Sequence, residues 1–191
     1  MPNSATRTKP GKRERLIESA RGLIHEQGVH RTTLAEVAER ADVPLGNVYY
    51  YFKTKDELVG AVLDCYKQQA ATLLETFERH RSPQARLKAL VRNWDEMRET
   101  VARHGCPMGS LCSELDKLDG GAGRGAAAVL AVIVDWAEGE FRQLGRRDAR
   151  DLALTLFAGV QGAALLANTF RDPTILTRQG RHLERWIDSL Q

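Results

Sequence analysis

The stretch from residue 33 to residue 58, TLAEVAERADVPLGNVYYYFKTKDEL, constrains the fold more than any other part of this chain. Thr33-x-x-Glu36 is a capping box, in which a hydroxyl and a carboxylate satisfy backbone N–H groups at the start of a helix. Residues 42–43 form a tight break, and Pro44 suits the first position of a second helix, where its missing N–H costs nothing. Two short helices joined by such a turn indicate a helix-turn-helix, whose second helix enters the major groove of DNA.

The rest of the chain shows helical periodicity, and no segment alternates apolar and polar residues as a strand does. We therefore expect an all-α protein of about nine helices. A first long helix that ends at Gly28 completes a three-helix head, and a second capping box, Thr54-x-x-Glu57, begins the fourth helix. The later helices are expected at 82–104, 107–118, 129–144, 148–170 and 173–190, and the glycine-rich residues 120–125 are expected to form a loop.

These signals divide the chain into a disordered basic arm (1–9), a helix-turn-helix head (10–56, with the motif at about 34–53) and a helical body (57–191). The net charge of +3 is uneven along the chain. Residues 1–55 hold ten Lys/Arg against six Asp/Glu, a net of +4, whereas the remainder holds eighteen against nineteen, a net of −1. A basic head on a nearly neutral body indicates a polyanion as the partner of the head.

The sequence points to a reducing compartment. Residues 1–15 are polar and contain no apolar core of a signal peptide, and no apolar run reaches the roughly 18 residues of a membrane helix. The three cysteines are widely spaced and do not form a disulfide framework. We therefore expect a cytoplasmic protein with no membrane partner.

Four linked blocks of this sequence resemble the N-terminal domain of the TetR family of transcriptional repressors: 33–38 (TLAEVA), 41–44 (ADVP), 48–52 (VYYYF) and 55–58 (KDEL). The resemblance covers roughly the first third of the chain. It implies a DNA-binding repressor whose fourth helix connects the head to the body and transmits ligand binding. It also implies double-stranded operator DNA as a partner and a pocket for a small-molecule effector in the body.

The residues expected to contact DNA fall into two groups. Base edges should be reached from the first turn of the second short helix, by Leu45, Gly46 and Asn47, because Asn can pair with adenine and Leu can pack on a thymine methyl. The family often has Ser or Thr at Pro44 and Lys or Arg at Leu45, and this sequence lacks both. Phosphates should be contacted by Thr33, Tyr49, Tyr51, Lys53 and Lys55, whereas Tyr50 and Phe52 are expected to pack in the core.

Residues about 148–190 are the expected dimer interface. The helix at 148–170 is apolar on two neighbouring faces: Leu152, Leu156, Gly159, Ala163, Leu166 and Phe170 form one, and Ala153, Phe157, Val160, Ala164 and Ala167 the other. A helix that is apolar around most of its circumference is buried on two sides. A central core helix in a monomer is the alternative. Helix-turn-helix proteins usually bind palindromic DNA as dimers, which favours an interface between two copies.

The effector pocket predicted by the resemblance has six candidate lining residues: Trp94, Met97, Met108, Leu111, Ile133 and Trp136. Residues of these types at helical spacing also make plain core. We expect the effector to be a small apolar or aromatic molecule. No strained nucleophile turn or paired acid–base spacing indicates an enzyme, and no cofactor is expected.

A second possible function rests on residues 104–112 (HGCPMGSLC). Cys106 directly precedes a predicted helix, where the positive end of the helix dipole favours a thiolate. Some TetR-type regulators that sense oxidants or electrophiles have a cysteine in this region, so Cys106, with Cys112, is a candidate thiol sensor. The alternative is a small buried residue at a helix start. A metal site made by His104 and these two cysteines has no recognised spacing and no evident fourth ligand.

Overall fold

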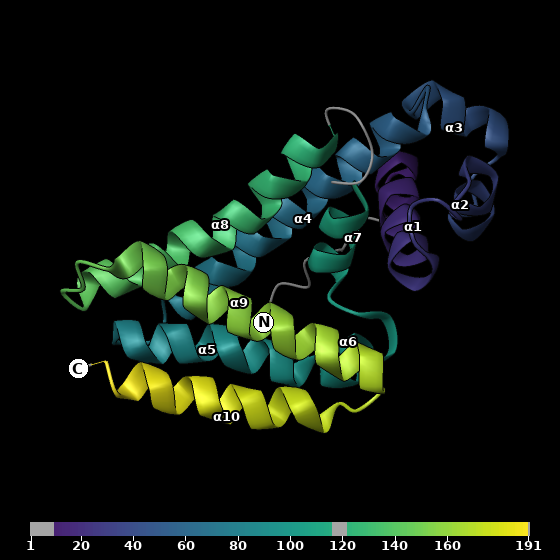
Figure 1. Ribbon diagram of the computed structural model, residues 1–191. Coiled ribbons are helices and arrows are strands. Elements are labelled where there is room, and N and C mark those ends of the chain that lie inside the picture. Colours follow the sequence, from purple (N-terminus) through teal and green to yellow (C-terminus); the bar gives the residue numbers. More distant parts are fainter. Residues whose placement is uncertain (1–9, 116–121, 191) are drawn as a thin grey trace, which may run out of the picture. The chain divides into compact units, whose positions relative to one another are not determined.

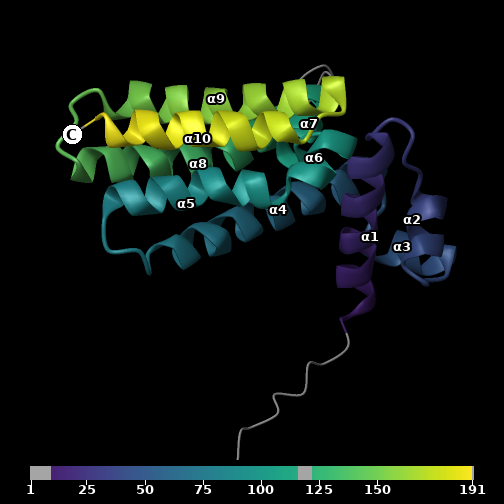
Figure 2. The same cartoon turned by 90° about the horizontal axis from the view of Figure 1, so that it is seen from below.

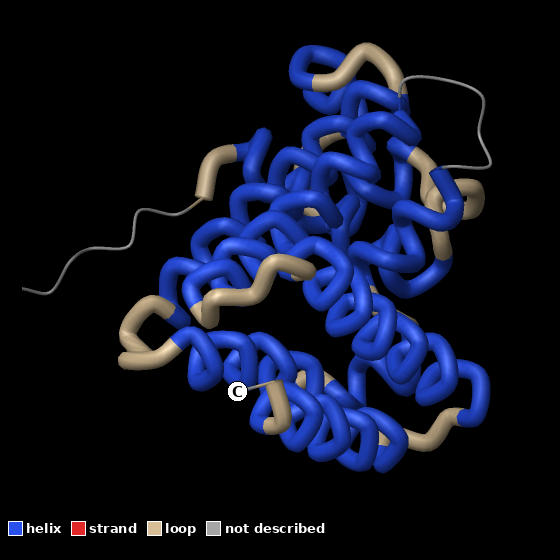
Figure 3. Tube along the Cα trace, turned by 60° about the vertical axis from the view of Figure 1, so that its left-hand side comes forward, coloured by secondary structure: helices blue, strands red, loops and turns tan. Residues whose placement is uncertain are grey.

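The structure is a computed structural model that describes residues 10–115 and 122–190, and these residues form helices and short connections without a strand (Figures 1 and 3). The predicted all-α fold is therefore confirmed. The chain divides into two compact units between Val62 and Leu63. We call the first unit the head and the second the body. The predicted basic arm, residues 1–9, lies outside the described residues.

The head consists of α1 (Lys12–Gln27), α2 (Leu34–Arg40), α3 (Leu45–Tyr51) and the first turns of α4 (Lys55–Phe77). Its core is made of fully buried apolar side chains from all four helices, among them Leu16, Val37, Val48 and Val62. The Arg40 guanidinium donates two hydrogen bonds of 2.6 Å to the Glu26 carboxylate, so α2 is also fixed to α1 by a bidentate ion pair.

The body contains the rest of α4 and α5 (Pro83–Glu96), α6 (Arg98–His104), α7 (Pro107–Leu115), α8 (Ala122–Gln143), α9 (Ala149–Phe170) and α10 (Thr174–Asp188). Two boundaries differ from the sequence prediction. The single helix expected at 82–104 is divided at Met97, whose backbone (φ −93°, ψ 6°) lies outside the helical region. The loop expected at 120–125 is helical from Ala122 onward, because packing outweighs the low helix propensity of glycine.

Within the body, α10 lies beside both α5 and α9 (Figure 2), and α9 also contacts α6 and α8. Gly159 of α9 brings α10 close, because a Cβ atom built at Gly159 would lie 3.0 Å from Leu183. A buried ion pair connects α5 to α8, with Arg86 Nε 2.7 Å from the Glu140 carboxylate. The Arg86 guanidinium also donates to the His80 carbonyl and the Gln143 side chain, so the buried charge is well partnered.

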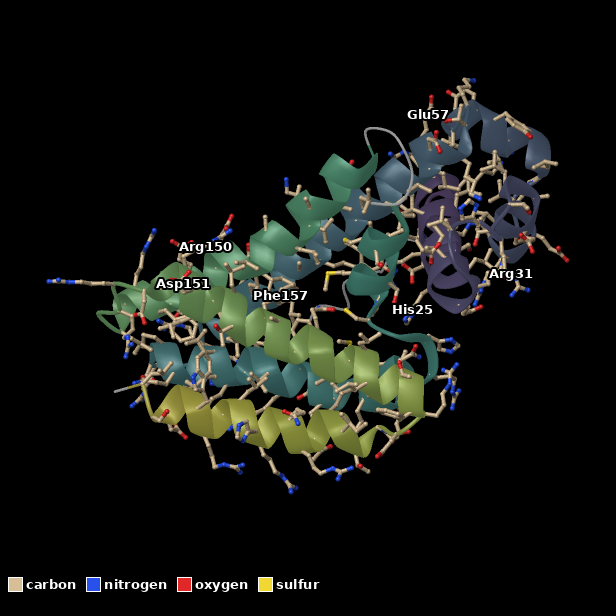
Figure 4. All side chains as sticks on the ribbon, viewed as in Figure 1. His25, Arg31, Glu57, Arg150, Asp151 and Phe157 are labelled. Atoms are coloured by element: carbon tan, nitrogen blue, oxygen red, sulfur yellow. The ribbon has the colours of Figure 1, made fainter. Side chains whose placement is uncertain are left out.

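The apolar content of α9 serves this packing. Its mean hydropathy of 1.4 and its length would suit a membrane span, but 44% of that segment is buried inside the body. Phe157 of α9 points into the body (Figure 4), where its ring lies edge-on to Trp94 of α5 with 6.2 Å between the centroids. One side of α9 therefore packs in the body core.

Candidate nucleic-acid interface and body cavity

The first capping box of the head has the predicted geometry. The Glu36 N–H donates to the Thr33 hydroxyl oxygen at 3.2 Å, and the Thr33 N–H donates to the Glu36 carboxylate at 2.8 Å. Hydrogen bonds from the Thr33 hydroxyl and N–H hold the pKa of Glu36 below its ordinary value. Because a lowered carboxylate pKa stabilises the fold only while the group is ionised, this cap is complete at neutral pH and is lost only in acid.

The turn between α2 and α3 relies on one residue in the left-handed region. Asp42 has φ 51°, a conformation that Asp tolerates better than most residues. The Val43 N–H returns to the Ala38 carbonyl at 3.0 Å and closes the turn. Pro44 is the N-cap of α3 instead of its first residue, so α3 begins at Leu45, one position later than the sequence predicted.

The exposed face of α3 carries large side chains. Leu45 is 43% exposed, Tyr49 48% and Tyr50 77%, while Gly46 is exposed, Asn47 and Tyr51 are half-buried and Phe52 is buried. The prediction that Tyr50 packs in the core is wrong. Val48 and Phe52 are four residues apart and share the buried face, which places Tyr50 on the opposite side of the helix. Its exposure could have been read from the 3.6-residue period.

Three of the residues predicted to contact phosphates, Thr33, Lys53 and Lys55, have side-chain hydrogen bonds within the head. The Lys53 ammonium donates to the Tyr49 carbonyl at 2.7 Å, and the Lys55 ammonium donates to the His30 carbonyl at 3.3 Å. Each ammonium carries three donors, so either lysine keeps donors for a phosphate. The Thr33 hydroxyl donates to the Glu36 carboxylate at 2.8 Å, which gives Thr33 a structural role beside the predicted one.

Thr33→Ala should therefore lower the free energy of unfolding by about 1 kcal/mol, because it removes the N-cap of α2. Urea denaturation measures this loss. Thr33→Ser is the matched control, since its hydroxyl keeps the cap and should leave the stability close to that of the wild type. Equal stability of all three proteins would mean that the capping box contributes nothing to the head.

The body contains a cavity of about 150 Å³ between α4, α5, α7 and α8. Four of the six predicted residues line it: Trp94, Met97, Met108 and Ile133. Leu111 and Trp136 are not among its lining residues. Leu111 is buried, and Trp136 packs on Phe77 with 6.0 Å between the ring centroids. None of the six predicted residues comes from α4 or is hydrogen-bonding in the manner of Tyr66, Gln69 and Asn93, which also line the cavity.

Cys106 also lines this cavity, and only 5% of the residue is exposed. Its sulfur accepts hydrogen bonds from the Gly109 N–H at 3.4 Å and from Gln161 Nε2 at 3.5 Å. Cys112 is buried elsewhere and donates to the Ala126 carbonyl at 3.3 Å. Within residues 10–115 and 122–190, no group of three or more His, Cys, Asp or Glu side chains could hold a metal ion.

One face of α9 is apolar and exposed. Leu154, Leu165, Leu166 and Phe170 are 47%, 66%, 44% and 67% exposed, and a Cβ atom built at the exposed Gly162 between them would meet nothing within 4 Å. Both predicted faces of α9 instead lie largely inside the body; Leu166 and Phe170 are the exceptions. The apolar stripe of α10, predicted as part of the interface, packs on α5 and α9 of the same chain.

Both the head and the body are similar to known protein families. Residues 16–62 match a family described as bacterial regulatory proteins, tetR family, and residues 83–182 match one described as the C-terminal domain of LmrA/YxaF-like transcriptional regulators. An uncharacterized HTH-type transcriptional regulator of Mycobacterium tuberculosis is 28% identical over 186 residues, which cover 93% of this chain and 94% of that protein.

Solved structures show the same fold. A TetR transcriptional regulator from Legionella pneumophila has a TM-score of 0.82 at 20% identity, over 95% of this chain and 98% of its own. The regulatory protein TetR from Rhodobacter sphaeroides has a TM-score of 0.80 at 26% identity, over 90% of this chain and 96% of its own. These similarities extend over head and body alike.

Proposed function

Since this chain belongs to the TetR family of bacterial transcriptional regulators, we propose that it is a homodimeric repressor of a palindromic operator, released from DNA by a small-molecule effector. It is a DNA-binding regulator and not an enzyme. Repression, dimerisation and effector release are the further steps that we propose. Because its partner is the chromosome, we place the protein in the cytoplasm.

The observation that carries the proposal is the exposed first turn of α3. Leu45 and Gly46 are exposed and Asn47 is half-buried, so the end of the helix that would enter the major groove is largely exposed. A gel-shift assay with the DNA directly upstream of the coding region tests the proposal. We expect a specific complex that survives an excess of unrelated DNA, and indifference to that DNA at low salt would refute it.

Asn47→Ala should relax the base preference at one position of each half-site. An Asn amide can make a bidentate contact to adenine, and its removal costs about 1–3 kcal/mol of discrimination. Binding to an operator series mutated at single positions measures this change. If affinity falls equally for every sequence, Asn47 contacts the DNA backbone and not a base.

Lys55→Ala should weaken binding to every DNA sequence and reduce the salt dependence. Removing one lysine–phosphate interaction from each half-site lowers the slope of log K against log salt by about one per site. Lys67→Ala is the control, because Lys67 is exposed on the body part of α4. An unchanged slope in Lys55→Ala would mean that Lys55 contacts no phosphate and bonds only to the His30 carbonyl.

We propose phosphate contacts also for Thr33, Tyr49, Tyr51 and Lys53. Tyr50 joins this set because its side chain is exposed.

The exposed face of α9 supports the homodimer. The four large apolar side chains at 154, 165, 166 and 170 recur at helical spacing along some 24 Å of the helix. A face that long and apolar is typical of an interaction site. A second copy is the occupant we propose, because the same face of α9 on two copies can pair about a two-fold axis, and a protein with two heads matches the two half-sites of a palindrome.

The cavity supports effector binding. It is apolar, lies in the body and is large enough for a small ring, since an engineered cavity of about 150 Å³ in another protein binds benzene. Bound effector would alter the packing of α4, which continues from the cavity into the head. We propose that DNA release follows from this change in α4.

A second candidate function is a redox or electrophile sensor based on Cys106, favoured by the position of its sulfur at the cavity. An electrophile that enters the cavity would meet the thiol, and alkylation would remove its hydrogen bonds to Gly109 and Gln161. Iodoacetamide labelling at neutral pH is the test. Rapid labelling in the folded protein, abolished by Cys106→Ser, supports the sensor. Slow labelling that needs denaturant leaves Cys106 as a buried packing residue.

A further inference from the structure

The cavity in the body is neutral. Its lining includes Tyr66, Gln69, Asn93 and Cys106 as polar residues, and the described residues contribute no Asp, Glu, Lys, Arg or His to it. A charged ligand would therefore lose its hydration without gaining a counter-ion. Burying an unpaired charge is far more costly than burying an apolar group of the same size. This lining selects against anions and cations.

Trp94 adds a directional requirement. The residue lines the cavity and is 2% exposed, and its indole Nε1–H has no hydrogen-bond acceptor among the described residues. Among the described residues, no other buried side-chain N or O atom lacks a hydrogen-bond partner. Buried tryptophan N–H groups usually have one, and a donor left unpaired away from water is unfavourable. A ligand in the cavity can supply the acceptor that the protein does not.

We propose that the effector is an uncharged, ring-sized molecule with a carbonyl or similar oxygen that accepts a hydrogen bond from Trp94 Nε1–H. This inference rests on the proposed effector function and adds the chemical class of the effector. The apolar wall formed by Leu74, Leu90 and Ile133 packs on the ring, while Trp94 fixes its orientation through the oxygen. Affinity therefore comes from the apolar wall and selectivity from one donor.

Three probes of similar size separate these contributions: acetophenone (neutral, with an acceptor), α-methylstyrene (neutral, with a CH₂ group in place of the oxygen) and benzoate (anionic). Calorimetry on the full chain should show acetophenone binding about tenfold more tightly than α-methylstyrene, because of the hydrogen bond. Benzoate should bind more than about a hundredfold more weakly than acetophenone. In the wild type, acetophenone but not α-methylstyrene should move one indole N–H signal downfield in an NMR spectrum.

Trp94→Phe keeps an aromatic ring and removes the donor, so the tenfold preference for acetophenone should disappear while α-methylstyrene still binds. Trp136→Phe is the matched control. Trp136 is a partly buried tryptophan of α8 outside the cavity lining, and its variant should keep the preference. If Trp94→Phe does not fold, as judged by circular dichroism, the role of Trp94 is tested on the wild type alone. The affinities for the three probes and the shift of the indole N–H signal then provide the test.

The outcomes separate this inference from the proposed function. Equal affinity for acetophenone and α-methylstyrene overturns the role of Trp94, even if both release DNA. A clear preference for acetophenone without any release of DNA supports the role of Trp94 and overturns effector control. If none of the three probes binds, the cavity is not a ligand site and both proposals fail.

Discussion

Leu165→Glu is expected to convert the proposed dimer into monomers and to lower the affinity for a palindromic operator by at least about a hundredfold. Leu165 is 66% exposed on the apolar face of α9, between Leu154 and Phe170. In a dimer its replacement would bury a carboxylate against apolar side chains without a partner. A single head contacts one half-site only, so most of the operator affinity should disappear with the dimer.

Sedimentation velocity measures the oligomeric state, and gel shifts with full and half operators measure the binding. Affinity for an isolated half-site should remain, because the head is unchanged. Gln68→Glu is the control, since it adds the same charge to an exposed position of α4, outside residues 148–190, and should remain dimeric. If Leu165→Glu stays dimeric with full operator affinity, the exposed face of α9 is not the interface.

The two capping boxes in the sequence correctly predicted the starts of α2 and α4. The Thr33 hydroxyl accepts a hydrogen bond from the backbone N–H three residues later, as predicted, and the Ser82 hydroxyl caps α5 in the same way. The Glu57 N–H likewise donates to the Thr54 hydroxyl oxygen at 3.1 Å. Each of these caps needs only residues within one turn, so it could be recognised without knowledge of the tertiary structure.

Features that depend on distant contacts were harder to predict. Gly125 lies inside α8, where a Cβ atom would come within 3.1 Å of Leu63. The low helix propensity of glycine had indicated a loop there, and this close contact suits a residue without a side chain. Similarly, Trp94 and Trp136 have comparable sequence surroundings, but only Trp94 lines the cavity. The cavity is formed by helices that are far apart in the chain. Their arrangement determines which apolar side chains are packed in the core and which line the cavity.

The orientation of α9 shows the same limit. Periodicity correctly indicated a helix apolar on most sides, but it could not assign each side to a neighbour. The stripe with Ala153, Val160 and Ala164 packs within the body, and the exposed stripe begins at Leu154, one residue further along. A shift of one residue rotates a helix face by about 100°, so the candidate interface could be placed only with the structure.

Gly46→Glu is expected to stabilise the free protein slightly and to abolish specific DNA binding. A Cβ atom at Gly46 would meet nothing within 4 Å, so a side chain fits there without strain. Glu has a higher helix propensity than Gly and is favourable in the first turn, which together should add about 0.5–1 kcal/mol to the free energy of unfolding. The same carboxylate would face the negative potential of the major groove, and such like-charge contacts cost several kcal/mol.

Stability and DNA binding should therefore change in opposite directions, which separates this variant from one that merely unfolds the head. Urea denaturation and operator titration at one salt concentration give the two quantities, and the loss of affinity should exceed about a hundredfold. Gly139→Glu controls for net charge, because a Cβ atom at Gly139 of α8 would also meet nothing within 4 Å, and this variant should keep DNA binding. If Gly46→Glu binds the operator as the wild type does, the first turn of α3 does not enter the groove. A carboxylate in the groove would be repelled by the phosphates and would weaken binding.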